Sequence, residues 1–328
     1  MDILNKNVTR TINGFFVIMI FLSHLTTFIT PETPFENALF VNIIPWFGQL
    51  MVASFLFFSG YGIYESIKNK KGYIKNLLKN RFLPLLFNFW ITVTLFIIMN
   101  FATGKSFSLR RTLLAFTGWE SIGNSNWFIF ATLVMYLFVL IGFKLCKKDS
   151  KEAITVVTLL TIIYMFIMRD FKDEYWFDTV ICFPAGMIFS YYKNIIADKI
   201  LAKKKYTIMA ILSSVVIFAI FYRLNKYVHN PFVYAITSIF FATTIALAFA
   251  KTKNSLRVLS WFGGHAFWFL MIQKIPMNLL AGKLTNPLMF IVSFSITIVL
   301  SGIMQFVTDK LWSKILIKKA NSTNLHKP

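Results

Sequence analysis

One histidine lies inside the first long apolar segment of the chain, within the sequence NGFFVIMIFLSHLTTF, and this residue is His24. An ionisable side chain inside a membrane-spanning helix is costly, so it usually faces a cavity or a partner. Imidazole titrates near neutral pH, and its neutral form can act as a general base for a hydroxyl group. The alternative is a histidine that bonds a neighbouring backbone or hydroxyl group and serves helix packing.

Arg10 precedes His24 by 14 residues. In an α-helix this spacing returns to nearly the same face, about 21 Å farther along the axis. One helix face would therefore present a cation at one membrane surface and a base near the other. The alternative is that Arg10 only extends its side chain to the membrane interface.

Two consecutive segments farther along the chain combine small, polar and cationic residues. The sequence FFSGYGI contains Ser59, Gly60, Tyr61 and Gly62. Such glycines allow close approach of helix backbones, and the serine hydroxyl can bond a neighbouring helix. A basic segment, KNKKGYIKNLLKNRFLP, follows and ends at Pro84. Its cations either orient the chain in the membrane or bind phosphate groups, as arginine does in a bidentate manner.

The longest connection between apolar segments is Ala102–Asn126. Connections longer than about 15 residues are often functional. This one carries side chains that suit a sugar, because rings stack on apolar sugar faces and polar groups bind hydroxyls: Lys105, Arg110, Arg111, Trp119, Glu120, Asn124 and Asn126, with Trp127 next. The alternative, to which we give equal weight, is an interfacial tryptophan belt with a short amphipathic helix.

The other histidines and the cysteines suggest no further chemistry. His265, in WFGGHAFWF, either lines a channel or serves packing, and packing is favoured; His229 and His326 lie in a loop and in the tail. No nucleophile elbow, phosphate loop or HExxH pattern is present. Cys146 and Cys182 have no metal-ligand spacing, and we expect neither a disulfide nor a metal site.

Composition indicates a membrane protein. Hydrophobic residues make up 57% of the chain and charged residues 14%, with mean hydropathy +0.64; soluble domains have about a quarter charged residues. A membrane helix needs about 20 apolar residues. We therefore predict an all-α integral membrane protein of about ten transmembrane helices, in a single domain over residues 1–328, with these segments: Ile12–Ile29, Ile44–Ile63, Phe82–Phe101, Trp127–Leu145, Ala153–Met168, Tyr175–Tyr192, Tyr206–Phe221, Phe232–Ala250, Val258–Gln273 and Leu288–Val307.

The charge pattern predicts the orientation. With ten helices and the N-terminus inside, 25 of the 34 Lys and Arg residues fall on the cytoplasmic side and 9 on the outer side. Both termini are therefore expected in the cytoplasm. The net charge of +21 lies in short clusters between apolar segments. This distribution favours the lipid bilayer as the partner and argues against nucleic acid.

Taken in order, these segments resemble the acyltransferase 3 family of bacterial membrane acyltransferases. Asn13-Gly14 through His24 is similar to the family's basic residue–Gly–apolar run–His signature, and Phe57–Ile63 to its FFxxSGF/Y motif. The later similarities are KNRFLPLL (Lys79–Leu86) to its cytoplasmic arginine motif, NWFIFATLVMYL (Asn126–Leu137) to its WFL segment, FPAGMIFSYYKNII (Phe183–Ile196) to its FxxGxxxxxY stretch, and SWFGGHAFWFLMIQ (Ser260–Gln273) to its LGxxSLxxYLxH region.

Three positions depart from the family pattern. Asn13 stands where the family has a basic residue, although Arg10 lies on the same face. Leu78 replaces one of two paired arginines, with Arg81 as the other. Gln273 stands where the family often has histidine.

The resemblance implies an acyl-CoA donor, expected to be acetyl-CoA, whose acyl group crosses the bilayer interior to a hydroxyl of an extracytoplasmic glycan such as exopolysaccharide, capsule or peptidoglycan. It implies no bound cofactor and a multi-pass bacterial plasma-membrane protein. It assigns catalysis to His24, which would deprotonate the hydroxyl or orient the thioester. The other assignments are donor binding at Arg10, Asn13, Lys75, Lys79 and Arg81, and an acceptor or structural role at Ser59, Gly60, Tyr61, Glu120, Asn126 and Trp127.

No extracytoplasmic hydrolase-like domain, which some relatives append, is expected here. The chain would complete the transfer alone or pass the acyl group to a separate acyl-accepting or glycan-assembly protein. A transporter or flippase of a lipid-linked glycan is the alternative, and it predicts pseudo-symmetric halves and broken helices. A non-catalytic membrane subunit is the third interpretation.

Overall fold

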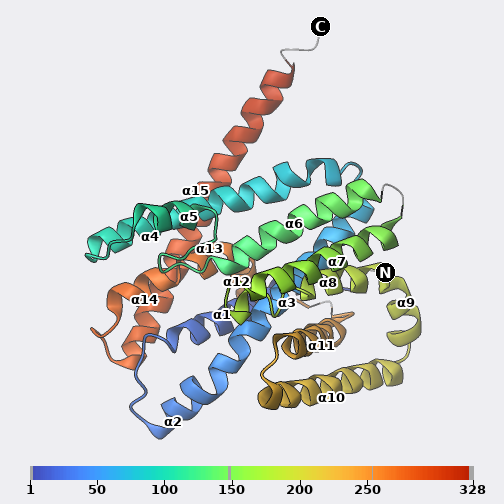
Figure 1. Cartoon of the computed structure of the whole chain (residues 1–328), viewed down its shortest axis with the longest axis horizontal. Coiled ribbons are helices and arrows are strands. Elements are labelled where there is room, and N and C mark those ends of the chain that lie inside the picture. The colour runs from blue at the N-terminus through green and yellow to red at the C-terminus, as the bar shows by residue number, and fades with distance from the viewer. Residues whose placement is uncertain (1–2, 147–148, 253, 325–328) are drawn as a thin grey trace.

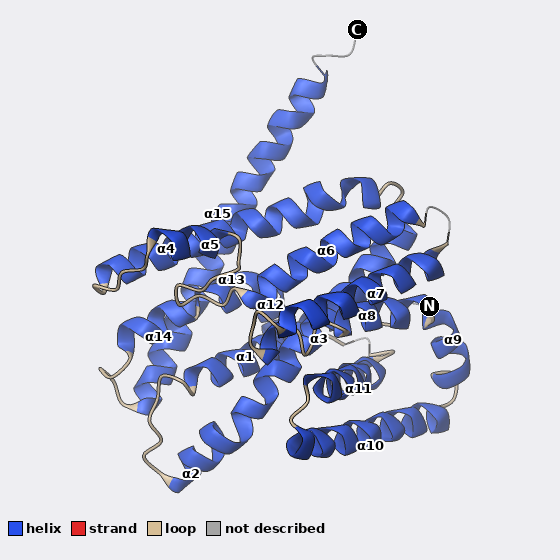
Figure 2. Ribbon diagram, viewed as in Figure 1, coloured by secondary structure: helices blue, strands red, loops and turns tan. Residues whose placement is uncertain are grey.

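The computed structural model describes residues 3–146, 149–252 and 254–324, which form helices and connections without any strand (Figure 1, Figure 2). The α-helices are α1 (Lys6–Leu25), α2 (Pro34–Glu36), α3 (Ile44–Asn69), α4 (Leu83–Ala102), α5 (Leu109–Phe116), α6 (Trp127–Leu145), α7 (Ser150–Arg169), α8 (Cys182–Tyr191), α9 (Lys193–Ile195), α10 (Lys204–Val228), α11 (Pro231–Phe249), α12 (Arg257–Gly264), α13 (Ala266–Ile272), α14 (Lys274–Leu280) and α15 (Asn286–Asn324). Tighter or wider helical turns cover Asn37–Ile43, Ile74–Asn76, Leu78–Phe82, Glu174–Trp176 and Ile196–Ile200.

The helices confirm an all-α integral membrane protein with about ten spans. Among the described residues, eight helices are long and apolar enough to cross a membrane. Two shorter apolar stretches, Cys182–Tyr191 and Ala266–Leu280, correspond to the sixth and ninth predicted segments. The first helix begins earlier than predicted, at Lys6, because the Asn5 side chain caps it by accepting from the Val8 N–H at 2.9 Å.

The sixth predicted segment, Tyr175–Tyr192, is only partly helical, so this boundary was wrong. Its α-helix starts at Cys182, after a 3₁₀ turn at Glu174–Trp176. Pro184 lies in the first turn of α8, where a missing N–H is tolerated. A helix that started a turn earlier would need that N–H for a bond to residue 180, so the proline sets the start.

The ninth predicted segment, Val258–Gln273, breaks at His265 into α12 and α13. Gly263 and Gly264 precede the break, and glycine is a poor helix former. The His265 ring stacks on Trp261, with ring centroids 4.1 Å apart, and its Nδ1 lies 2.8 Å from the Trp261 carbonyl oxygen. His265 therefore packs at the break, as the packing interpretation expects.

Contacts between distant connections define two ends of the helix bundle. At the N-terminal end, where α1 begins, the Lys251 N–H donates to the Ile3 carbonyl at 3.1 Å. At the opposite end, where α1 finishes, the Asn286 amide donates to the Thr30 carbonyl at 2.8 Å. In Figure 1, α9 lies at the right and α2 and α14 at the left. The connections alternate between these two ends along the chain.

Glycines bring two pairs of helices into direct backbone contact. In the α1–α12 pair, a Cβ at Gly14 would lie 1.8 Å from the Leu259 carbonyl oxygen, and a Cβ at Gly263 would lie 1.9 Å from the Arg10 carbonyl oxygen. No side chain fits at such distances, so the two glycines make this crossing possible.

The α3–α8 pair repeats this arrangement. A Cβ at Gly60 would lie 1.9 Å from the Phe183 carbonyl oxygen, and a Cβ at Gly186 would lie 1.9 Å from that of Phe57. A Cβ at Gly62, in contrast, would meet nothing within 4 Å. Of the two glycines predicted to serve helix packing in this segment, only Gly60 does so.

Candidate active site

A polar cavity of about 600 Å³ opens at the N-terminal end between α1, α3 and the helical turn Leu78–Phe82 before α4. We call it the basic cavity, because its lining includes the cations Lys6, Arg10, Lys70, Arg81 and Lys193. Asn13 also lines it, and its Oδ1 is buried without a hydrogen-bond partner. A buried polar atom without a partner is rare in proteins, so the cavity has an unmet hydrogen bond as well as excess positive charge.

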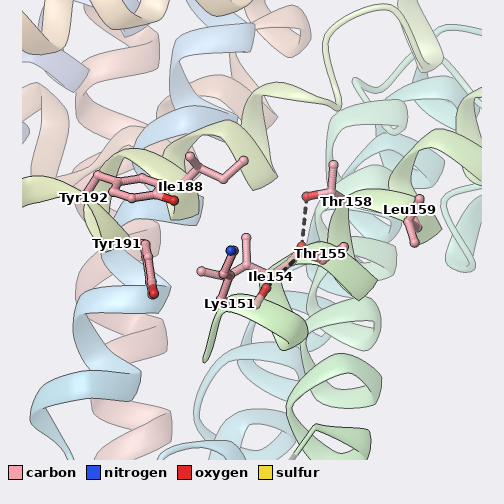
Figure 3. Close-up of a pocket in the computed structure, with 8 residues that line it drawn as sticks. All are labelled: Lys151, Ile154, Thr155, Thr158, Leu159, Ile188, Tyr191 and Tyr192. Carbon is pink, nitrogen blue, oxygen red and sulfur yellow. Dashed lines mark hydrogen bonds between the residues drawn. The ribbon is translucent and has the colours of Figure 1, made fainter. Parts of the chain in front are cut away.

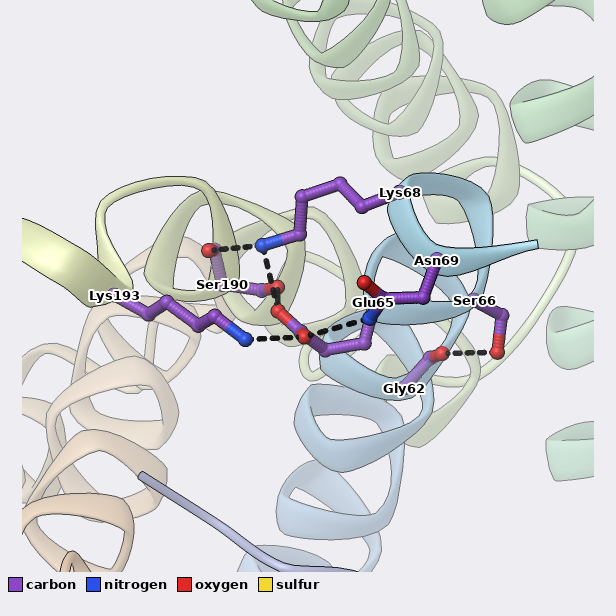
Figure 4. Close-up of polar contacts among 7 residues, drawn as sticks. All are labelled: Gly62, Glu65, Ser66, Lys68, Asn69, Ser190 and Lys193. Atoms are coloured by element: carbon purple, nitrogen blue, oxygen red, sulfur yellow. Dashed lines mark hydrogen bonds and ion pairs between the residues drawn. The ribbon is translucent and has the colours of Figure 1, made fainter. Parts of the chain in front are cut away.

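Glu65 is the acidic residue of this cavity, and its charge is already neutralised (Figure 4). It pairs with Lys68 at 2.7 Å and with Lys193, and it accepts from the Ser190 hydroxyl at 2.5 Å. These contacts join the end of α3 to α8 and α9. Sequence reasoning missed Glu65, although a carboxylate inside an apolar helix is a recognisable signal.

Four cations of the basic cavity have no carboxylate partner among the ion pairs of the described residues: Lys6, Arg10, Lys70 and Arg81. Arg81 is oriented by a neutral group, since its Nε donates to the Tyr73 hydroxyl at 3.1 Å. Uncompensated cations in a concave site concentrate anions. The cavity is therefore suited to a ligand with several negative charges.

Not all predicted donor residues reach this cavity. Arg10, Asn13 and Arg81 line it, whereas Lys75 and Lys79 do not. Both lysines are exposed on the helical turns before α4. The structure therefore gathers only part of the predicted set.

His24 lies near the other end of α1 and lines a small cavity of about 40 Å³. We call this the histidine cavity; Trp127, Ser125, Phe55 and Leu270 also line it. The Ser125 hydroxyl oxygen is buried without a hydrogen-bond partner. The cavity is thus mostly apolar, with a few polar groups.

The Gln273 side chain bonds His24 directly. Its Nε2 lies 2.9 Å from His24 Nδ1 and donates to the Leu270 carbonyl at 3.1 Å, and its own Oε1 is buried without a partner. Only an amide nitrogen can donate to both acceptors, so Nδ1 accepts and the ring proton sits on Nε2. The imidazole in this state presents an N–H donor rather than a free base.

Three phenylalanines separate the two cavities. Phe58 lines the basic cavity and Phe55 the histidine cavity, one helical turn apart on α3. The ring of Phe16 on α1 is fully buried and contacts both, with centroids 5.7 Å from Phe55 and 6.2 Å from Phe58. Both cavities therefore lie along the α1–α3 interface, with an aromatic barrier between them.

Ser59 and Gly60 line neither of these cavities, whereas Tyr61 lines the basic cavity. Ser59 hydrogen-bonds Tyr136 on α6, and Gly60 makes the α3–α8 crossing. Tyr61 lines the basic cavity, and its ring packs on Phe189 with centroids 6.2 Å apart.

Polar side chains of the connection before α6 hold it in place through a hydrogen bond and an ion pair. The Asn126 amide is buried and donates to the Gly118 carbonyl at 2.7 Å, and Glu120 pairs with Lys172 at 3.7 Å. Short α5 makes part of this connection amphipathic, as the interfacial interpretation expects. Of the predicted acceptor residues here, only Trp127 reaches a cavity that also contains His24.

A hollow of about 340 Å³ between α7 and α8 has a different character (Figure 3). Its lining is mainly isoleucine, leucine, threonine and tyrosine side chains. The hydroxyls of Thr155 and Thr158 bond carbonyls of their own helix at 3.0 and 2.8 Å. The hollow therefore has few polar groups left to bind a ligand, and we treat it as part of the apolar surface of the helix bundle.

The fold and site define a polytopic membrane protein whose first helix lines a basic cavity at one end and carries a cavity-lining histidine near the other. The family profile described as "Acyltransferase domain" matches residues 11–305. The chain therefore belongs to the acyltransferase 3 family and is a membrane acyltransferase. No curated protein and no solved structure matches it significantly.

Proposed function

We propose that this protein transfers an acetyl group from acetyl-CoA to a hydroxyl of an extracytoplasmic glycan in a bacterial plasma membrane. The observation that carries the proposal is the placement of Arg10 and His24 on one helix, one in each cavity. The distance along α1 is about 21 Å for 14 residues. A long donor could therefore have its charged end at one cavity and its acyl group at the other.

The basic cavity suits the phosphates of coenzyme A. Arg81 and Arg10 supply guanidinium groups, which bind phosphate in a bidentate manner. The excess of Lys and Arg in the connections at the N-terminal end favours the cytoplasm for that side. Cytosolic acetyl-CoA would then reach the basic cavity directly.

The acyl group would reach His24 along the α1–α3 interface. Rotation of the Phe55 and Phe58 side chains would open the barrier around Phe16 to the narrow arm of the donor. Closure of the same rings after entry would exclude water, which protects a thioester from hydrolysis. The acceptor hydroxyl would arrive from the opposite end of the bundle.

In the transfer step the hydroxyl oxygen attacks the thioester carbonyl carbon, the C–S bond breaks, and the hydroxyl proton passes through His24 to the leaving sulfur. For this role Nε2 must lose its proton. If the Gln273 amide group rotates by half a turn, its unpartnered Oε1 can accept from the Nδ1–H of His24. The Nε2 of His24 is then a free base. The orientation described above instead suits a hydrogen bond to the thioester carbonyl.

The proposal is tested with purified protein in proteoliposomes, acetyl-CoA labelled in the acetyl group, and deacetylated cell-envelope glycans. We expect label in the glycan that mild alkali releases as acetate, because an O-acetyl ester is alkali-labile. Folded protein that leaves the glycan unlabelled would overturn the proposal. Movement of a lipid-linked glycan without acetylation would instead indicate a flippase.

Arg81→Ala is expected to raise the KM for acetyl-CoA about tenfold with little change in kcat. A hydrogen bond to a charged group is worth about 1.5–3 kcal/mol, and Arg81 would bind the donor equally in the ground and transition states. Lys71→Ala is the matched control, because Lys71 follows Lys70 but does not line the basic cavity. Steady-state kinetics with varied acetyl-CoA measures both; equal KM values in the two variants would remove Arg81 from the donor site.

Gln273→Leu and Gln273→Glu together test how His24 is used. Leucine removes the partner of Nδ1, so we expect kcat to fall about tenfold, the value of one hydrogen bond. An ionised glutamate can only accept, so it selects the Nδ1–H form with Nε2 free. If His24 acts as a base, activity is then expected to stay within about threefold of that of the unmodified protein. Gln305→Leu on α15, where Gln305 bonds Asp309, is the control. Equal loss in both Gln273 variants would instead assign His24 the donor role.

A further inference from the structure

A third cavity lies at the opposite end of the bundle and has no part in the steps above. Its volume is about 370 Å³, within the usual range of ligand pockets. We call it the tyrosine cavity. It lies between the start of α3, the residues before α8, and the α10–α11 connection, and it is lined by Gln49, Glu174, Tyr175, Asp178, Asn225, His229 and Tyr234.

The polar groups of this cavity suit hydroxyl groups. Asp178 is buried at 7% exposure, and its Oδ1 accepts from the Gln49 amide at 2.8 Å. Its carboxylate has no cationic partner among the ion pairs of the described residues. A carboxylate held by neutral donors keeps lone pairs for further donors, and sugar hydroxyls are such donors.

The aromatic lining adds a surface for a sugar ring. Tyr175 is 43% exposed, whereas Tyr234, on α11, is half-buried. An aromatic ring offers a rigid apolar face with a polar tip. Together with carboxylate and amide groups, such faces bind a molecule that is apolar on one side and hydroxylated at its rim.

The tyrosine cavity adjoins the histidine cavity through one aromatic pair. Trp127 lines the histidine cavity, and its ring meets that of Tyr175 edge to face with centroids 5.9 Å apart. Helices α1 and α3 are also in close contact beside these cavities, since a Cβ at Gly48 on α3 would lie 2.2 Å from the hydroxyl oxygen of Ser23 on α1. Gln49 and His24 are the next residues on α3 and α1. A ligand in the tyrosine cavity would thus sit beside the base.

We propose that the tyrosine cavity binds one sugar ring of the acceptor, with the ring against Tyr175 and its hydroxyls on Asp178 and Gln49, and that it presents a further hydroxyl past Trp127 to His24. This inference rests on the proposed glycan acceptor. A metal ion is a poorer fit, because the described residues contain no group of three or more His, Cys, Asp or Glu side chains placed to hold one. The predicted acceptor residues Glu120 and Asn126 do not line this cavity.

The test is a binding titration of the full chain in lipid nanodiscs, followed by saturation-transfer NMR. The probes are the methyl glycosides of glucose, galactose, mannose and N-acetylglucosamine. We expect at least one glycoside to bind saturably, and its Kd to rise about tenfold or more in Tyr175→Ala and in Asp178→Asn. Tyr227→Ala is the control, because Tyr227 is an exposed tyrosine at the same end that does not line the cavity.

Acetyl-CoA binding is measured on the same samples, so that the proposed donor and the proposed sugar site can each be refuted independently of the other. Saturable glycoside binding without acetyl-CoA binding would contradict the proposed donor and leave the sugar site standing. Acetyl-CoA binding without any glycoside binding, or glycoside binding that Tyr175→Ala and Asp178→Asn leave unchanged, would overturn the sugar site.

Discussion

His24→Ala is expected to lower the rate of acetyl transfer by about a hundredfold to ten-thousandfold, the range that a positioned general acid or base contributes. The imidazole is the ionisable group that lines the histidine cavity, and Gln273 holds its ring in place. Transfer of labelled acetate to the glycan at saturating acetyl-CoA measures the effect. The loss should appear in kcat.

The control for this variant is donor binding. The basic cavity lies at the other end of α1, behind the rings of Phe16, Phe55 and Phe58, so the Kd for acetyl-CoA should change little. Unchanged transfer by a folded His24→Ala protein would refute a catalytic role for this histidine. Loss of acetyl-CoA binding along with transfer would indicate that His24 serves packing.

Gly60→Ala is expected to destabilise the folded protein by about 3 kcal/mol or more, because overpacking a tight contact costs about 1–3 kcal/mol and sometimes more. The new methyl group would meet the carbonyl oxygen of Phe183 at 1.9 Å, and backbone cannot rotate away as a side chain can. Helices α3 and α8 would have to separate. The apparent Tm, measured by size-exclusion chromatography after heating, should fall by several degrees.

Gly62→Ala is the matched control for stability, two residues along the same helix. Its methyl group would meet nothing within 4 Å. Alanine is the better helix former by about 1 kcal/mol, so Tm should stay the same or rise slightly. An equal decrease in both variants would mean that helix propensity or lipid contact, rather than the α3–α8 crossing, decides the outcome.

Much of the architecture could be predicted from the chain because the bilayer imposes a simple rule. Every spanning segment needs about 20 apolar residues in a helix, and nine of the ten predicted segments coincide with long helices or with the paired α12 and α13. The sixth segment was the exception. Trp176, Phe177 and Val180 are buried by packing in turns before α8, and hydropathy cannot distinguish that burial from a longer helix.

The candidate site was predictable only where a residue type was itself unusual. His24 stands out in an apolar helix, and Arg10 lies on its face by helix periodicity. Lys75 and Lys79 were grouped with Arg81 by proximity in the chain, but of the three only Arg81 lines the basic cavity. Gln273 appeared only as a departure from a family pattern, since nothing in its own neighbourhood shows that it would bond a residue 249 positions away.

Composition and helix periodicity thus sufficed to predict the helical membrane class and the approximate number of spans, and they singled out His24 as the candidate for chemistry. These properties depend on amino-acid composition and on the 3.6-residue periodicity of a single α-helix, which can both be read from short stretches of the chain. Which side chains share a cavity depends instead on how the helices pack. The Gly14–Gly263 and Gly60–Gly186 crossings bring distant helices into backbone contact, and this close packing sets the positions of the basic, histidine and tyrosine cavities relative to one another.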